Sequence, residues 1–221
     1  MSDQGFAKPI RLLHSLLAIC MLAQLAIGEL MDVPEVETAP AAVGISWIVP
    51  AYAHEGHHQA IPGMPVEETL GFEVHEFLGL AIASLILLRI MLAMTSLPGA
   101  NWRELVPWAS AAGRKQLGDE IKTQLADWKQ GKLAALEDGE AVARCVHGLI
   151  LLAGVIMGIT GTILFFGWSR TAPQTDIIEL IASTHEVVVG GLEALLGAHL
   201  LAVILHQRQG HNIIARIKPT A

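Results

Sequence analysis

The chain has 221 residues, of which 52% are hydrophobic and only 16% are charged, and its mean hydropathy is +0.50. This balance is too apolar for an ordinary soluble domain and indicates a protein that lies mostly in a membrane. The formal net charge of −7 says little about the partners of such a protein, among which we expect no nucleic acid.

Four apolar stretches approach the length that crosses a bilayer. They are Leu12–Leu30, Leu70–Met94, Val146–Trp168 and Ile177–Leu205. We expect helices over about residues 9–30, 66–95, 140–168 and 177–207. A span tolerates polar residues when its polar face points into a bundle. The sequence therefore predicts an all-α, integral membrane four-helix transmembrane bundle, formed by residues 1–221 as a single domain.

The first apolar stretch also resembles a signal peptide. The small-residue motif around Ala53 lies more than twenty residues beyond that stretch, too far for one cleavage signal, so we interpret the stretch as a retained helix. The segment after it, residues 31–64, contains His54, His57 and His58. These three histidines could bind zinc or copper. Because the sequence offers no other defined ligand beside them, we prefer to interpret the segment as a solvated loop or a docking surface.

The basic residues predict the orientation of the bundle. Thirteen of the fourteen Lys and Arg residues lie on or close to the side that holds both termini, and only Arg170 lies on the other. Short loops rich in Lys and Arg stay in the cytoplasm, so we expect both termini there, in a multi-pass protein of the bacterial inner membrane.

The cytoplasmic loop between the second and third spans is expected to contain short amphipathic helices. Within it, Trp102–Trp108 and Gly118–Lys132 alternate apolar and charged positions with helical spacing, which favours helices at the membrane interface. The basic residues of this loop are expected to meet anionic lipid.

Three further residues are expected to mark helix ends. Asp138 can cap the third span, and Asp176 can cap the fourth, with Glu179 completing a capping-box-like start. The glycine at position 210 allows the fourth helix to stop.

The most informative feature of the chain is a pair of histidines in the last apolar stretch. His185 and His199 are fourteen residues apart, which on a helix places them within roughly 40° of one another and about 21 Å apart. Each leaflet therefore receives one imidazole on the same side of the helix. Placing an imidazole at this depth costs free energy unless the imidazole interacts with a group inside the bundle. The arrangement suits two metal centres, one above the other.

Two more histidines complete one pair in each leaflet. His75 and His185 both lie about nine residues into their spans from the exterior side, while His14 and His199 lie toward the cytoplasmic side. A structural zinc ion is bound by four protein ligands and a catalytic zinc ion by three, whereas a b-type haem needs only two axial ligands. The sequence has no Cys-x-x-Cys-His, which excludes the usual covalent attachment of a c-type haem.

Three segments resemble a known family. They are Arg11–Ala18, His75–Leu80 and His185–His199. Together they are similar to the bacterial cytochrome b561 family, which itself resembles the b-type cytochrome subunits of nickel–iron hydrogenases and formate dehydrogenases. The resemblance spans nearly the whole chain, and its most specific element is the fourteen-residue spacing in the last span. It implies two haems b, with one bound by His75 and His185 on the exterior side and the other by His14 and His199 on the cytoplasmic side.

The resemblance also implies a function in a respiratory chain. The expected role is transmembrane electron transfer between a membrane quinone, ubiquinone or menaquinone, and a periplasmic or membrane-bound redox protein. The chain would be an electron carrier or a subunit of a quinone-linked oxidoreductase, in a homodimer or a larger complex. Its long exterior segment and large cytoplasmic loop differ from the family pattern, so the identity of the redox partner stays undetermined.

Two alternative functions remain. The chain could be a metal-ion transporter that uses the intramembrane histidines, or a membrane-anchoring subunit of a redox complex.

Two further residues are expected to contact the cytoplasmic haem. His147 competes with His14 as the partner of His199. We favour His14, in which case His147 contacts a haem propionate or lines a quinone pocket. Arg11 can pair with a propionate because guanidinium binds carboxylate well, although a basic residue at this membrane edge is also what the topology requires.

Overall fold

The computed structural model describes residues 6–31, 33, 69–95, 97, 101–131, 141–210 and 213–218. Its long helices are α1 (Lys8–Leu30), α2 (Leu70–Ala93), α5 (Ala141–Gly167) and α6 (Asp176–Arg208), each long and apolar enough to cross a membrane. Its short elements are α3 (Trp102–Leu105), the 3-10 helix η1 (Pro107–Ala109), α4 (Ala111–Lys129) and α7 (Ile213–Ile217). These residues form no strand, so the prediction of an all-helical protein with four candidate membrane spans is confirmed.

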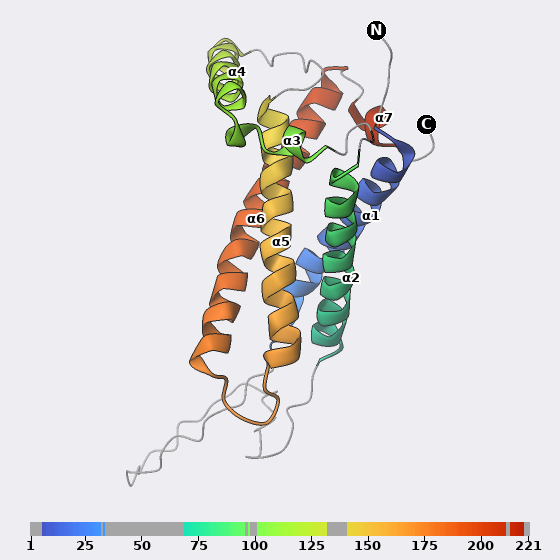
Figure 1. The fold of residues 1–221 in the computed structure, drawn as a ribbon, viewed down its shortest axis with the longest axis vertical. Helices are drawn as coiled ribbons and strands as arrows, with labels where there is room; N and C mark the ends of the chain where they lie inside the picture. Colours follow the sequence, from blue (N-terminus) through green and yellow to red (C-terminus); the bar gives the residue numbers. More distant parts are fainter. Residues whose placement is uncertain are drawn as a thin grey trace.

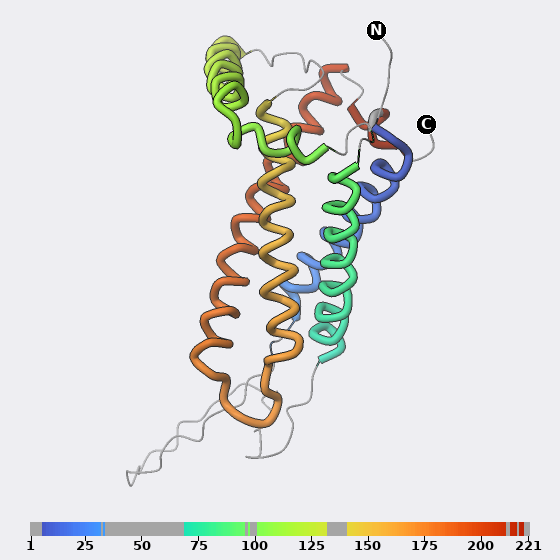
Figure 2. The backbone as a smooth tube through the Cα atoms, viewed as in Figure 1, coloured from blue at the N-terminus to red at the C-terminus, as the bar shows by residue number. Residues whose placement is uncertain are grey.

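The four long helices run side by side along the length of the molecule (Figure 1). Helix α1 packs on α2, α2 on α5, and α5 on α6, and the tube trace shows how these helices alternate in direction (Figure 2). One end of the bundle carries α3, η1, α4 and α7, together with most of the described Lys and Arg residues, and is called the basic end. The opposite end, where Trp168–Thr175 connects α5 to α6, is called the turn end.

The start of α1 and the end of the described chain meet at the basic end. Arg11 donates from Nη1 to the carbonyl oxygen of Lys218 at 3.0 Å, and α7 packs against both α1 and α6. Pro9 occupies the first turn of α1, where its missing N–H costs nothing. The bundle therefore places both ends of the described chain on the same side, as the distribution of basic residues predicts.

Helix α2 begins later than the expected start near residue 66. The hydroxyl of Thr69 accepts a hydrogen bond from the N–H of Phe72 at 3.3 Å and caps a helix that starts at Leu70. A threonine cap satisfies a backbone N–H that has no partner inside the helix. The exterior segment with His54, His57 and His58 lies outside the described residues.

Helix α6 also starts differently from the prediction. Its cap is Thr175, which accepts from the N–H of Ile178 at 3.4 Å, so the expected cap at Asp176 is wrong by one residue. Asp176 and Glu179 instead lie in the first turn, where their charges interact favourably with the helix dipole. The far end agrees with the prediction, since the helix stops at Arg208 and Gly210 takes a positive φ of 88°.

The start of α5 depends on a residue from α4. The backbone N–H groups of Ala141 and Val142 donate to the carboxylate of Glu120 at 2.6 and 3.0 Å. The carboxylate thus satisfies two N–H groups at a helix N-terminus and complements its dipole. The predicted cap, Asp138, lies outside the described residues.

The interior of the bundle is not filled by side chains. Among the described residues, no large side chain is completely buried, whereas protein interiors are normally close-packed. A cavity of about 760 Å³ lies between α1, α2, α5 and α6. The helices are therefore arranged around a space that would hold a large ligand.

Candidate functional site

The described histidines inside the bundle form two groups, one toward each end. The turn-end site contains His75 of α2 and His185 of α6, which line the same cavity. The basic-end site contains His14 of α1, His147 of α5 and His199 of α6. All five imidazoles are half-buried. The structure thus brings together the two pairs expected from the sequence, and it places His147 beside one of them.

Two glycines let the turn-end imidazoles lie close to neighbouring helices. A Cβ atom on Gly28 of α1 would lie 3.2 Å from Cε1 of His75, and one on Gly161 of α5 would lie 3.3 Å from Cε1 of His185. Both distances are shorter than ordinary van der Waals contact, so larger residues would push the rings into the cavity. The cavity therefore keeps its width because these two positions have no side chain.

A hydrogen bond fixes the orientation of one turn-end imidazole. Nδ1 of His185 lies 2.7 Å from Oγ1 of Thr160, whose hydroxyl donates to the carbonyl oxygen of Ile156 at 2.8 Å. In the tautomer with the ring proton on Nδ1, His185 donates to Oγ1 of Thr160, whose own proton goes to the carbonyl oxygen of Ile156. The lone pair of Nε2 is then free to bind a metal.

Three buried polar atoms of the cavity lining have no hydrogen-bond partner. They are Nδ1 of His75, Oε1 of Gln24 and Nε1 of Trp168. Buried polar groups are nearly always hydrogen-bonded in proteins. Their presence in the lining favours a ligand that has polar groups as well as a large apolar body.

An ion pair lies beside His75. Nη2 of Arg170, in the turn between α5 and α6, lies 3.2 Å from Oε2 of Glu76. Glu76 is largely buried and lines the cavity. The turn end therefore holds a carboxylate next to a candidate ligand and a guanidinium that compensates it.

The basic-end site has a different geometry, because its imidazoles lie close to one another. One potential ligand atom from each of His14, His147 and His199 lies within 4.8 Å of the others. The ring centres of His14 and His199 are 6.5 Å apart, with an interplanar angle of 60°, and those of His147 and His199 are 4.8 Å apart. Two imidazoles on opposite sides of a metal, with metal–nitrogen bonds of about 2.0 Å, have ring centres roughly 6 Å apart. The spacing therefore favours His14 over His147 as the partner of His199.

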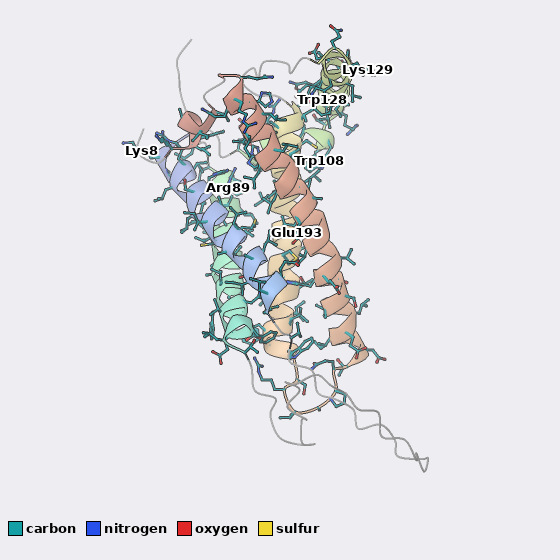
Figure 3. All side chains as sticks on the ribbon, turned by 180° about the vertical axis from the view of Figure 1, so that it is seen from behind. Lys8, Arg89, Trp108, Trp128, Lys129 and Glu193 are labelled. Carbon is teal, nitrogen blue, oxygen red and sulfur yellow. The ribbon has the colours of Figure 1, made fainter. Side chains whose placement is uncertain are left out.

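Two arginines of the basic end, Arg11 and Arg89, belong to the helices that carry or neighbour the basic-end site. Arg11 lies one turn from His14, and its buried Nε has no hydrogen-bond partner. Arg89 of α2 is an electrostatic neighbour of both His14 and His147, and Figure 3 shows it toward the basic end. An anionic group bound here would lie near the guanidinium of Arg89, and such groups bind carboxylates well.

Several residues of these sites were not singled out from the sequence. Thr160 and Gln24 contact the turn-end histidines, and Glu76 and Arg170 form the neighbouring ion pair. A polar residue inside an apolar stretch was the available signal, because such residues usually face the bundle interior. The pairing itself could not be deduced, since Thr160 and His185 are twenty-five residues apart.

The arrangement fits a b-type haem at each end. Such a haem needs two axial ligands, which His75 and His185, or His14 and His199, can supply. Close glycines, a large cavity and unpartnered polar atoms at the turn end fit a broad cofactor with polar edges. A guanidinium nitrogen without a partner at the basic end fits a cofactor carboxylate.

Comparison with known proteins supports the same cofactor. The sequence profile of the family described as prokaryotic cytochrome b561 matches residues 5–220. No curated protein and no solved structure matches the chain. The matched region includes all four long helices and both groups of histidines.

Proposed function

The chain belongs to the prokaryotic cytochrome b561 family, a family of transmembrane b-type cytochromes that transfer electrons, and we propose that it carries two haems b in series. The ligands would be His75 and His185 at the turn end, and His14 and His199 at the basic end. In this proposal electrons pass between a membrane quinone, ubiquinone or menaquinone, and a periplasmic or membrane-bound redox protein.

The observation that carries this proposal is the position of the imidazoles on α6. His185 lies on the wall of the turn-end cavity, and His199 lies among the basic-end imidazoles. Since fourteen residues of helix separate them by about 21 Å, one rigid helix contributes a ligand to each site. Two metal centres held in this way form a route across the thickness of the bundle.

At the turn end, the chain orients the ligands and excludes water. Thr160 would hold the ring of His185, while the apolar lining, which includes Ile82, Ile86 and Leu192, would keep the site dry. A bound haem supplies a one-electron carrier, whose redox properties depend on these surroundings.

At the basic end, the chain would bind the second haem and the quinone. Arg11 would bind a haem propionate through its unpartnered Nε. The ring of His147 packs against that of His199, so His147 would line a quinone pocket at the edge of the haem. We place this end in the cytoplasm and the protein in the bacterial inner membrane, because basic loops remain on the cytoplasmic side.

The proposal is tested by the cofactor content and the optical spectrum of the purified chain. We expect split b-type bands in the reduced-minus-oxidised spectrum and about two haems per chain by pyridine haemochromogen assay. A chain that is free of haem but loaded with zinc would instead support metal-ion transport. A chain that binds neither and still assembles with redox subunits would support an anchoring role.

A further inference from the structure

Helix α4 is held firmly at the basic end, across the direction of the spans. Figure 1 shows it nearly end-on, while α5 runs along the length of the molecule. Glu120 of α4 accepts from the first two N–H groups of α5, and Arg144 of α5 donates to Oε1 of Gln116 at 3.5 Å. At Gly148, the missing side chain lets α5 approach the carbonyl of Leu105. These contacts fix α4 at the level where α5 begins.

The exposed surface of α4 is divided into an apolar stripe and a row of lysines. The side of α4 that is turned toward the rest of the protein includes the half-buried Leu117, Glu120 and Gln124. Next to it lies the apolar stripe, formed by Ile121, Leu125 and Trp128, which are 43%, 49% and 58% exposed. Beyond the stripe, at intervals of seven residues, lies the lysine row, formed by Lys115, Lys122 and Lys129.

We propose that α4 lies in the surface of the bilayer, with the apolar stripe at the acyl boundary and the lysine row on anionic headgroups. An amphipathic helix with an apolar face and a basic flank binds membranes in this way, and tryptophan favours the interface. The contact of Glu120 with the start of α5 places α4 next to the membrane edge. Asp119 pairs with Lys122 at 3.8 Å, but such an exposed pair is weak and leaves the row positive.

The test compares two neighbouring positions of α4 in the full chain. Leu125→Cys and Ala126→Cys are made in a Cys20→Ser, Cys145→Ser background, labelled with bimane and reconstituted into vesicles of phosphatidylcholine and phosphatidylglycerol. Because successive residues of a helix point about 100° apart, Ala126 serves as the matched control outside the stripe. We expect lipids brominated on the acyl chain to quench the bimane fluorescence at position 125 several-fold more than at position 126. Iodide, which quenches from the aqueous phase, should quench position 126 more than position 125.

A second arm tests the charge of the lipid. Replacing Lys115, Lys122 and Lys129 with Gln should reduce the quenching of position 125 by brominated lipid in vesicles with phosphatidylglycerol, and Arg replacements should preserve it. Each lysine is expected to change the docking equilibrium by about fivefold. Equal quenching at positions 125 and 126 would overturn the proposal. Protection of position 125 from both quenchers would also overturn it, because the apolar stripe would then be covered by protein rather than by lipid. A response independent of lipid charge would overturn the role of the lysine row.

A different observation concerns the turn-end site, and it rests on the proposed function. Thr160 is only 8% exposed, and its hydroxyl is committed to the carbonyl oxygens of Ile156 and Met157 at 2.8 and 3.3 Å. When Nε2 of His185 binds the haem iron, Nδ1 carries the ring proton and donates it to Oγ1 of Thr160, which lies 2.7 Å away. Nδ1 of His75, across the same cavity, has no partner.

We infer that Thr160 is a positioning residue, which would make His75 and His185 unequal as ligands of the proposed turn-end haem. A hydrogen bond from the second ring nitrogen fixes the tautomer of a ligating histidine and makes it a stronger donor. A stronger donor stabilises the ferric more than the ferrous state. Thr160 therefore lowers the potential at which the turn-end haem accepts one electron.

The test compares Thr160→Val with Thr160→Ser in the haem-loaded chain. We expect Val to shift the ferric–ferrous equilibrium of the turn-end haem about tenfold toward the ferrous state, which is about 59 mV for one electron. Ser should stay close to the parent, and the basic-end haem provides an internal reference. The electron paramagnetic resonance spectrum of the ferric haem should also change in the Thr160→Val variant but not in Thr160→Ser.

The outcomes separate this inference from the proposed function. A parent chain without haem would contradict the proposed function itself. A Thr160→Val variant with two haems and the potentials of the parent would overturn only the role of Thr160. Loss of the turn-end haem in both Thr160→Val and Thr160→Ser would do the same. Loss of that haem in Thr160→Val but not in Thr160→Ser would support the positioning role.

Discussion

The turn-end and basic-end sites use the same ligand chemistry in different surroundings. At the turn end, His75 and His185 face a cavity of about 760 Å³, next to the buried carboxylate of Glu76. At the basic end, the rings of His14, His147 and His199 lie close together near guanidinium groups. The difference shows that one helix, α6, presents one imidazole beside a compensated carboxylate and another beside further imidazoles and a guanidinium.

The charges near each site indicate how the two proposed haems should differ in reduction potential. The ferrous state carries one negative charge more than the ferric state, so nearby cations stabilise it and nearby carboxylates destabilise it. Arg89 near the basic-end site therefore favours a higher potential there, and the Glu76 charge that Arg170 leaves uncompensated favours a lower one at the turn end. The predictions below test whether the two sites are as separate as this comparison implies.

The largest effect should come from removing the ligands on α6. His185→Ala should remove the turn-end haem and His199→Ala the basic-end haem, because each haem would lose one of its two axial bonds. Haem content should fall from about two per chain to about one in both variants, by pyridine haemochromogen assay. Redox titration should then show one remaining component, different in the two variants. Loss of both haems in either single variant would mean that the sites are not independent.

The second prediction concerns the two candidate partners of His199. We expect His14→Ala to lose the basic-end haem and His147→Ala to keep it, since the ring spacing of His14 and His199 is closer than that of His147 and His199 to the spacing of two imidazoles on opposite sides of a metal. The measurement is haem content together with the rate of haem reduction by a soluble quinol. His147→Ala should retain about two haems and show slower reduction. The assignment would be reversed if His147→Ala lost a haem and His14→Ala did not.

Much of the fold could be predicted because the signals lie within single segments. The four spans follow from apolar stretches, and the shared side of His185 and His199 follows from helical periodicity alone. The ends of helices were less predictable, because the cap of α6 is Thr175 rather than Asp176. Both residue types are good caps, so the sequence could not distinguish them.

Contacts between distant segments were not predictable. Glu120 accepts from the start of α5 across about twenty residues, and no local pattern marks it as a cap for another helix. The same holds for the contact between Thr160 and His185, because it requires the relative rotation of α5 and α6. The distances between rings, which favour His14 over His147, likewise depend on how α1, α5 and α6 are placed relative to one another.

The third prediction uses a glycine to narrow the turn-end cavity. In Gly161→Leu, the new Cβ would lie 3.3 Å from Cε1 of His185, and the side chain would displace the ring or occupy the cavity. We expect haem affinity at the turn end to fall by about 1–3 kcal/mol, the usual cost of overpacking. The matched control is Gly190→Leu, since a Cβ on Gly190 would meet nothing within 4 Å. Equal haem loss in the two variants would point to general destabilisation of the spans.

The smallest effect should come from the ion pair beside His75. Arg170→Gln removes the guanidinium that compensates Glu76, so more of the carboxylate's charge would act on the turn-end haem. We expect the potential of that haem to fall by roughly 40 mV, equivalent to about 1 kcal/mol, and Glu76→Gln should shift it in the opposite direction. Lys8→Gln, at the exposed start of α1 (Figure 3), removes the same charge far from this site and should change neither potential. A shift of the basic-end haem in Arg170→Gln would show that the charges at the two ends act on both haems.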